Sequence, residues 1–245
     1  MSVSVTSLYR RLGPVDLRNV WRDPLLAWVG ILPFAFALLY RQIPLLRLLL
    51  LRHFEFDLEP WYPLIASTFL AAAPGVVGLV IGFLLIDERD DGVLAAISVA
   101  PVRPSTYILY RISAPLAVSM LITVLAYPLI ALTPLRFADL LAAAAVASFV
   151  APITALFLAT FAQNKVSAFA MVKILNTIEL APVAAWFIPE PAQWLAGVVP
   201  SYWPMKMVWR AAAGESYAIH ALAGVAVSAA VLALLYRSFR RKLYR

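Results

Sequence analysis

The sequence contains no cysteine and only two histidines in 245 residues. Without cysteine, the chain can form no disulfide, no thiolate metal site and no thiol nucleophile. His53 and His220 are far apart in the chain, so a histidine-based metal site is not expected. A GxxxxGK[ST] phosphate loop, a GxSxG nucleophile elbow and an HExxH helix are also missing. We therefore expect this chain to carry no catalytic residues, no metal, no cofactor and no ATP site of its own.

Charged residues are scarce as well. They make up 13% of the chain, whereas hydrophobic residues make up 63% and the mean hydropathy is +0.86. This charged fraction is roughly half of that in soluble domains. A spanning helix needs about 20 mostly apolar residues. The composition therefore predicts an all-α integral membrane protein with about six spans and no sizeable soluble domain.

Six apolar stretches are suited to span a bilayer. They cover residues 25–40, 62–86, 114–132, 140–161, 168–188 and 219–236. The predicted organisation is an N-terminal interfacial segment (1–24), a six-span transmembrane domain (25–236) and a basic cytoplasmic tail (237–245).

The net charge of +7 is interpreted through its distribution along the chain. Thirteen lysines and arginines fall on the side that holds both termini and six on the other. The positive-inside rule then places both termini in the cytoplasm, and we expect a multi-pass protein of the bacterial plasma membrane. Because the basic residues flank spans and form no separate domain, we expect contacts with anionic lipid and none with nucleic acid.

Two segments outside the spans are predicted to lie along the membrane surface. The first precedes the first span and ends in Arg18, Trp21, Arg22 and Asp23. Apolar residues alternate there with arginine and aspartate, which is typical of an interfacial helix, and a solvated tail is the alternative. The second, residues 41–61, mixes leucines and arginines on the outer side.

The inner loop 87–102, between the second and third expected spans, is the most informative stretch. It begins with four acids around Arg89, which are Asp87, Glu88, Asp90 and Asp91. A short helix is predicted to follow and to stop at Pro101, with the acids near its positive N-terminal end. Val93, Leu94 and Ile97 give this helix a small apolar face. A solvated acidic loop is the alternative.

This loop resembles the one in type 2 ATP-binding-cassette export permeases, which show an E-R-E-x-G-T-L-E-x-L-L-x-T-P-V pattern between their second and third spans. The residues that match in place are Glu88, Arg89, Gly92, Leu94, Pro101 and Val102. The sequence departs from the pattern at Val93 and Ala100, where the family favours threonine. It also has Ala95 where the family often has glutamate, so the resemblance does not imply the polar contact to the ATPase that this glutamate would make.

The outer stretch between the fifth and sixth spans fits the same family. It carries four prolines and three tryptophans, which are Pro189, Pro191, Pro200, Pro204, Trp194, Trp203 and Trp209. Prolines break a continuous span and tryptophans prefer the interface, so short re-entrant helices are expected. The family has a P-x-x-W element there, which Pro200 to Trp203 matches. An ordinary tryptophan-rich interfacial loop is the alternative.

The resemblance implies a six-span bundle that works as two permease subunits, identical or homologous. Each pair would bind separate cytoplasmic ATPase subunits that hold the ATP and Mg. The implied ATPase-coupling residues are Glu88, Arg89, Asp91, Gly92, Leu94, Ile97 and Pro101. The N-terminal helix would help to pass the movement of the ATPases to the spans.

The fifth span contains ionisable residues inside the bilayer. Lys173, Asn176 and Glu179 follow one another at steps of three, which brings successive pairs together on a helix. An acid near the middle of a bilayer is a functional candidate. These three residues are predicted to face the translocation path or a subunit interface, and a purely structural role for Glu179 is the alternative.

Two rival functions have weaker support. Membrane phosphatidyltransferases use a D-x-x-D-G-x-x-A-R motif, which Asp91, Gly92 and Ala95 imitate, but Ala96 stands where arginine is needed. An ion-coupled secondary transporter usually needs midplane ion sites and repeat symmetry. The chain has one deeply placed acid and no visible repeat. No residue identifies the transported substrate.

Overall fold

The computed structural model describes residues 5–92 and 104–243, and within these residues the regular secondary structure is entirely helical. The helices, in chain order, are α1 (Val5–Arg22), α2 (Pro24–Tyr40), α3 (Ile43–Phe54), η1 (Glu59–Trp61), α4 (Tyr62–Asp90), α6 (Pro104–Ile130), α7 (Phe137–Ala147), α8 (Val150–Phe161), α9 (Lys165–Ile178), α10 (Leu180–Ala185), η2 (Ala192–Val198), α11 (Tyr202–Ala212) and α12 (Ala218–Leu243).

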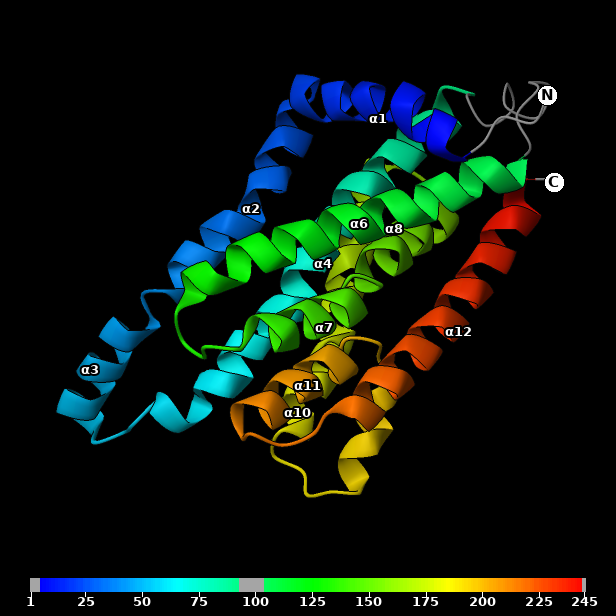
Figure 1. The fold of residues 1–245 in the computed structure, drawn as a ribbon. Coiled ribbons are helices and arrows are strands. Elements are labelled where there is room, and N and C mark those ends of the chain that lie inside the picture. The colour runs from blue at the N-terminus through cyan, green and yellow to red at the C-terminus, as the bar shows by residue number, and fades with distance from the viewer. Residues whose placement is uncertain (1–4, 93–103, 244–245) are drawn as a thin grey trace.

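The prediction of six spans in an all-α bundle is confirmed. Six helical stretches of the described residues are long and apolar enough to cross a membrane: Leu26–Phe54, Glu59–Asp90, Leu109–Ile130, Phe137–Phe161, Lys165–Ala185 and Ala218–Arg241. In Figure 1, α1 lies across one end of the bundle, and the last turns of α12 reach the same end. This arrangement agrees with an even number of crossings.

The fourth span, expected as one helix, is broken between α7 and α8. Pro152 has no N–H to donate to the carbonyl of Ser148 four residues earlier. The backbone N–H of Ala151 donates to that carbonyl instead, at 3.2 Å, and so does the hydroxyl of Ser119 on α6, at 3.3 Å. The freed carbonyl is therefore satisfied inside the bundle, which is what a break at membrane depth requires.

The fifth span is broken in a similar way, at Glu179 between α9 and α10. Pro182 cannot donate to the carbonyl of Ile178, so the helix cannot run straight through this point. The backbone N–H of Glu179 still donates to the carbonyl of Leu175, at 3.0 Å. Glu179 therefore lies at a junction between two helices. The sequence alone predicts it in the middle of one continuous helix.

The position of the acids around Arg89 corrects the sequence interpretation. Helix α4 continues four residues past the expected span end at residue 86, so Asp87, Glu88 and Asp90 belong to its last turn. Carboxylates at a helix C-terminus meet the negative end of the helix dipole. Cations from other segments, Lys165 and Arg111, neutralise Asp87 and Glu88 there. The segment 93–103, with the predicted short helix, lies outside the described residues.

Helix α4 is the centre of the bundle and packs closely against α8. Gly78 and Gly82 make the close approach possible: a Cβ on Gly78 would lie 2.5 Å from the carbonyl oxygen of Ala151, and one on Gly82 would lie 3.0 Å from a methyl of Leu158. Small residues at a helix interface let backbones approach in membrane proteins. The α4–α8 pair thus forms the rigid core to which the other helices attach.

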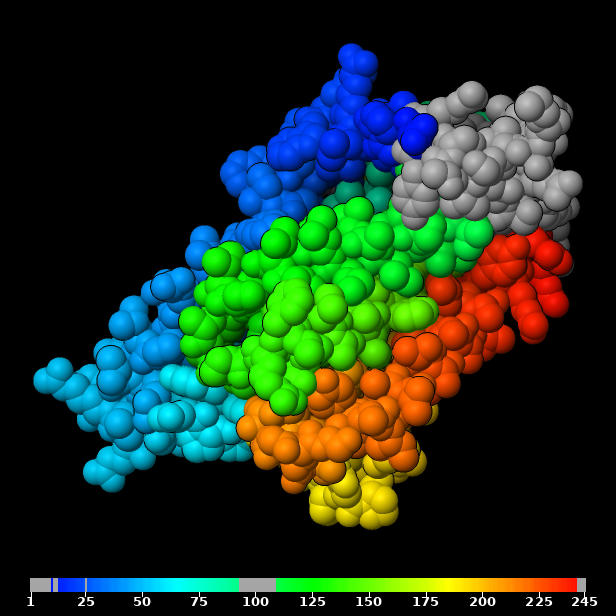
Figure 2. Space-filling view, viewed as in Figure 1, coloured from blue at the N-terminus to red at the C-terminus, as the bar shows by residue number. Residues whose placement is uncertain are grey.

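The segment 41–61, predicted to lie on the outer side, is helical at α3, which follows α2 after a two-residue turn. None of the α3 residues is buried, and Figures 1 and 2 show α3 projecting beyond the rest of the molecule. Arg47 donates from Nε to Asp57 at 2.7 Å and also pairs with Glu59. Two acids of this segment therefore neutralise the charge of one of its own arginines. Its placement on the membrane surface stays a prediction, as does that of α1.

Two short helices, η2 and α11, lie between the fifth and sixth spans. All eight residues from Tyr202 to Trp209 on α11 are buried. The indole N–H of Trp203 donates to the carbonyl of Gly197, and that of Trp209 donates to the hydroxyl of Ser67 on α4, at 2.9 and 2.8 Å. Helix α11 is therefore packed into the bundle and is not a loose loop. Its re-entry into the membrane stays a prediction.

Candidate functional sites

A buried arginine joins three helices at the end of the bundle where α4 stops. Arg111 on α6 is 3% exposed, and its guanidinium donates to Asp16 on α1 at 2.7 and 3.3 Å. It also makes a short hydrogen bond to Glu88 on α4. The hydroxyl of Tyr110 donates to Asp16 at 2.6 Å. We call these four residues the Arg111 hub. One buried cation thus holds carboxylates from two other helices, and the three helices are fixed to one another.

Arg89, the neighbour of Glu88, connects the same turn of α4 to the fourth span. Its guanidinium donates to the carbonyls of Ala162 and Gln163, just past the end of α8, at 2.8 and 2.6 Å. The matched family residues Glu88 and Arg89 therefore both hold the end of α4, one to α6 and the other to the end of α8.

Lys165, at the start of α9, adds further ionic contacts beside the Arg111 hub and Arg89. We call all of these contacts together the charged layer. Its ammonium lies 2.9 Å from a carboxylate oxygen of Asp87 and 3.3 Å from one of Asp23. Asp23 sits between α1 and α2, and its other oxygen accepts from the backbone N–H of Leu26. Ionic contacts therefore link α1, α4, α6 and α9 at one end of the molecule.

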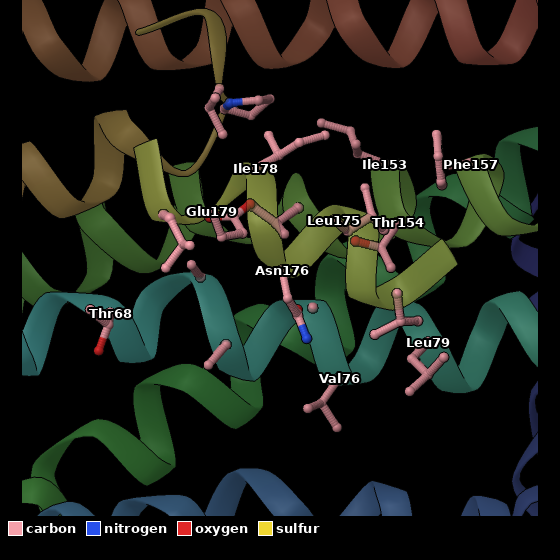
Figure 3. A pocket seen from close by; sticks show the side chains of 18 of the residues that line it. Thr68, Val76, Leu79, Ile153, Thr154, Phe157, Leu175, Asn176, Ile178 and Glu179 are labelled. Carbon is pink, nitrogen blue, oxygen red and sulfur yellow. The ribbon is translucent and has the colours of Figure 1, made fainter. Parts of the chain in front are cut away.

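A groove of about 670 Å³ runs along the inner side of α9 and α10, against α4 and α8 and with α2 and α12 at its margins. Its walls are mainly apolar. Four polar side chains line it: Thr68, Thr154, Asn176 and Glu179. Figure 3 shows the labelled residues projecting from α4, α8 and α9 around this space. Helix α9 packs loosely here. All of its residues are described, and Ala168 is the only one of them that is buried.

Glu179 is anchored at one end of this groove. The hydroxyl of Ser201, a fully buried residue at the start of α11, donates to one of its carboxylate oxygens. Pro200, the neighbour of Ser201, also lines the groove. The segment before α11 thus closes the groove beside the junction of α9 and α10.

Comparison with known proteins identifies the family. A family model described as Rv2686c-like, fluoroquinolones export permease protein, matches residues 16–236. The chain belongs to this family. It is 32% identical over 234 residues to the fluoroquinolones export permease proteins MT2760 and Rv2686c from two strains of Mycobacterium tuberculosis, covering 94% of this chain and 93% of each relative. No solved structure matches the permease. A transport role is thereby favoured over an enzymatic one, and the family agrees with the resemblance to type 2 exporter permeases.

The predicted site residues of the fifth span are separated in the permease. Asn176 and Glu179 line the groove, whereas Lys173 does not and is exposed. Six residues of α-helix turn through about 600°, which leaves Lys173 on a different side of the helix from Glu179. The hydrophobic stretch indicated the right helix, but steps of three do not keep three successive residues on one face.

The predicted coupling residues are only partly described. Asp91 is the C-cap residue of α4, and Gly92 follows with a φ of +70°, a backbone conformation that favours glycine. Leu94, Ile97 and Pro101 lie outside the described residues. On the N-terminal helix, Trp21 is 63% exposed, Arg18 and Arg22 are also exposed, and Asp23 pairs with Lys165.

Sequence reasoning missed the Arg111 hub. Arg111 and Lys165 count in the sequence only among the thirteen basic residues on the side of the termini, and Asp16 and Tyr110 belong to none of the motifs described above. The available signal was the excess of carboxylates in residues 87–91, where four acids accompany one arginine. It could have suggested a charged layer, but the partners are up to 142 residues apart, so their pairing depends on the fold.

Proposed function

We propose that the permease is the membrane subunit of an ATP-driven exporter in the bacterial plasma membrane. It would work as a pair with a second copy or a homologous permease, driven by separate ATPase subunits that hold the ATP and Mg. Family membership supports the export role. The resemblance of the loop 87–102 to that of type 2 exporters supports the ATP-driven part.

The single observation that carries this proposal is the Arg111 hub. The last turn of helix α4 forms the start of the segment 87–102, and this turn is tied to α6 and α1 by one buried guanidinium. A force on that loop would move the three helices together, because breaking a buried ion pair leaves an uncompensated charge at a cost of about 3–5 kcal/mol. The hub is therefore suited to transmit movement from an ATPase to the spans.

The proposed subunit interface includes the outer side of α9. Lys173 and Thr177 are exposed there, in a stretch apolar enough to span the membrane. Polar side chains at membrane depth rarely face lipid. A second permease subunit over this side of α9 would shield them.

The proposed cargo is drug-like, because the relatives are named as fluoroquinolone exporters and the groove has a suitable size. Sites for drug-sized molecules are mostly apolar, with a few polar groups and a volume of about 300–1,000 Å³. The groove, at about 670 Å³, fits this description.

The test is transport in proteoliposomes that contain the permease with and without an ATPase subunit that co-purifies with it. Efflux of a fluoroquinolone should require both proteins and ATP. Leu94→Asp should leave the permease inserted but abolish ATPase co-purification, because it places a charge on the predicted docking face. Efflux by the permease alone, driven by a proton or sodium gradient, would instead establish the ion-coupled alternative.

A further inference from the structure

We propose that the groove selects amphiphilic organic cations, with Glu179 as the residue that recognises the positively charged group. The inference rests on the proposed function, because it names the substrate class of the proposed exporter. It is carried by the composition of the groove walls and by the hydrogen bonding of Glu179.

The groove has one charged lining residue, and that residue is an acid. Among the lining residues, all of which are described, there is no lysine, arginine or histidine. Lys173 and Lys165 on the same helix are not part of the lining. A cationic ligand in this space would therefore meet an acidic side chain whose negative form is offset by no basic side chain among the lining residues. Anionic ligands are disfavoured for the same reason.

The carboxylate of Glu179 has capacity for a further partner. In the described part of the chain, Ser201 donates to one oxygen, and no basic side chain forms an ion pair with either. An ionised carboxylate in an apolar environment is costly unless it is paired. An ammonium group of a bound molecule would supply that pairing, whereas a neutral ligand of the same shape would not.

The remaining lining suits the body of such a molecule. Phe36 and Phe157 provide aromatic faces, and aliphatic side chains make up most of the rest. Asn176 lies one turn before Glu179 on the same face of α9, and its amide is available for a neutral polar group of the ligand. The ligand class is therefore a drug-sized aromatic molecule with a cationic group at one end.

The test uses two fluorescent aromatic probes that differ in a single group. One carries a trimethylammonium group, whose charge does not change with pH, and the other has a neutral tert-butyl group of similar size. Binding to the full-length permease in lipid nanodiscs is measured without the ATPase. We expect the cationic probe to bind at least about tenfold more tightly than the neutral one.

Variants of α9 identify the residue responsible. Glu179→Gln should reduce the preference to within about twofold by weakening only the cationic probe. Glu179→Asp should retain most of the preference and controls for loss of folding. Lys173→Gln also changes one charge on α9, but outside the groove, and should not abolish the preference.

Three results would overturn the inference. The first is that both probes bind equally tightly to the wild type. The second is that Glu179→Gln and Lys173→Gln lose the preference for the cationic probe to the same extent. The third is that neither probe binds and that an Asn176→Cys variant forms a cross-link between two copies of the chain. The last result would mean that a second subunit fills the groove. A cation preference without ATPase association would count against the proposed function alone, and ATP-driven export without a cation preference would count against this inference alone.

Discussion

At the scale of single residues, Arg111 is the position whose loss should cost most. Arg111→Gln removes the buried cation that pairs with both Asp16 and Glu88. We expect a loss of about 3–5 kcal/mol, seen as a lower thermal-unfolding midpoint in detergent. Arg18→Gln is the matched control, because Arg18 is exposed on the same helix as Asp16.

The same site offers a second comparison. A triple variant, Asp16→Asn, Arg111→Gln and Glu88→Gln, removes both carboxylate charges together with the cation. It should be more stable than Arg111→Gln alone, since no uncompensated charge remains. If the single variant unfolds at the same temperature as the wild type, the hub does not hold the three helices together.

The ion pair between Glu190 and Lys206 should make the stability of the protein sensitive to acid. The ammonium of Lys206, 2.5 Å away, lowers the pKa of Glu190 from its usual 4.5. A carboxylate whose pKa is lowered by folding stabilises the protein above its unfolded pKa, and this contribution is lost as the pH falls through the folded value. The wild type should therefore unfold at a higher temperature than Glu190→Gln at neutral pH, and the difference should shrink below about pH 4.5. A difference that stays constant with pH would contradict this assignment.

At the scale of helices, the sequence predicted the spans well and the breaks poorly. Hydropathy located all six spans because lipid selects long apolar stretches whatever their packing. The α7–α8 break was missed because its cause, Pro152, is itself compatible with an apolar window, and its stabilising partner Ser119 lies on another helix. Glu179 was identified as an intramembrane acid, but its place in a groove depends on Pro182 and on how α9 packs.

The close packing of α4 on α8 gives a prediction at this scale. Gly78→Ala places a methyl 2.5 Å from the carbonyl oxygen of Ala151 and 2.7 Å from Cβ of Thr154, so the helices must separate. We expect a loss of about 1–3 kcal/mol in the free energy of unfolding. Gly75→Ala, three residues earlier on α4, meets no atom within 4 Å and should be neutral or stabilising. Equal stability of the two variants would mean that α4 and α8 are not in close contact.

At the scale of the whole molecule, the charged layer and the groove lie in one continuous arrangement of helices. Helix α9 begins at Lys165, in ionic contact with Asp87 at the end of α4, and ends beside Glu179 in the groove. Helix α9 therefore connects the proposed coupling end to the proposed cargo site over 14 residues, or about 21 Å. A movement of α4 at its last turn would reach the groove through α9 as well as through α4 itself.

The proposed coupling to an ATPase requires the charged layer to face the cytoplasm, where ATP is available. The absence of native cysteine allows single-cysteine labelling of the whole permease. Because Gly92 has a positive φ, Asp91→Cys is a less strained choice at the exposed end of α4. In intact cells an impermeant thiol reagent should leave Asp91→Cys unlabelled and should label Leu46→Cys on α3 and Trp194→Cys on η2, both of which are exposed. Permeabilised cells should label all three variants, which shows that each thiol is accessible. Labelling of Asp91→Cys in intact cells would invert the topology, and an ATPase in the cytoplasm could then not reach the loop that begins at the end of α4.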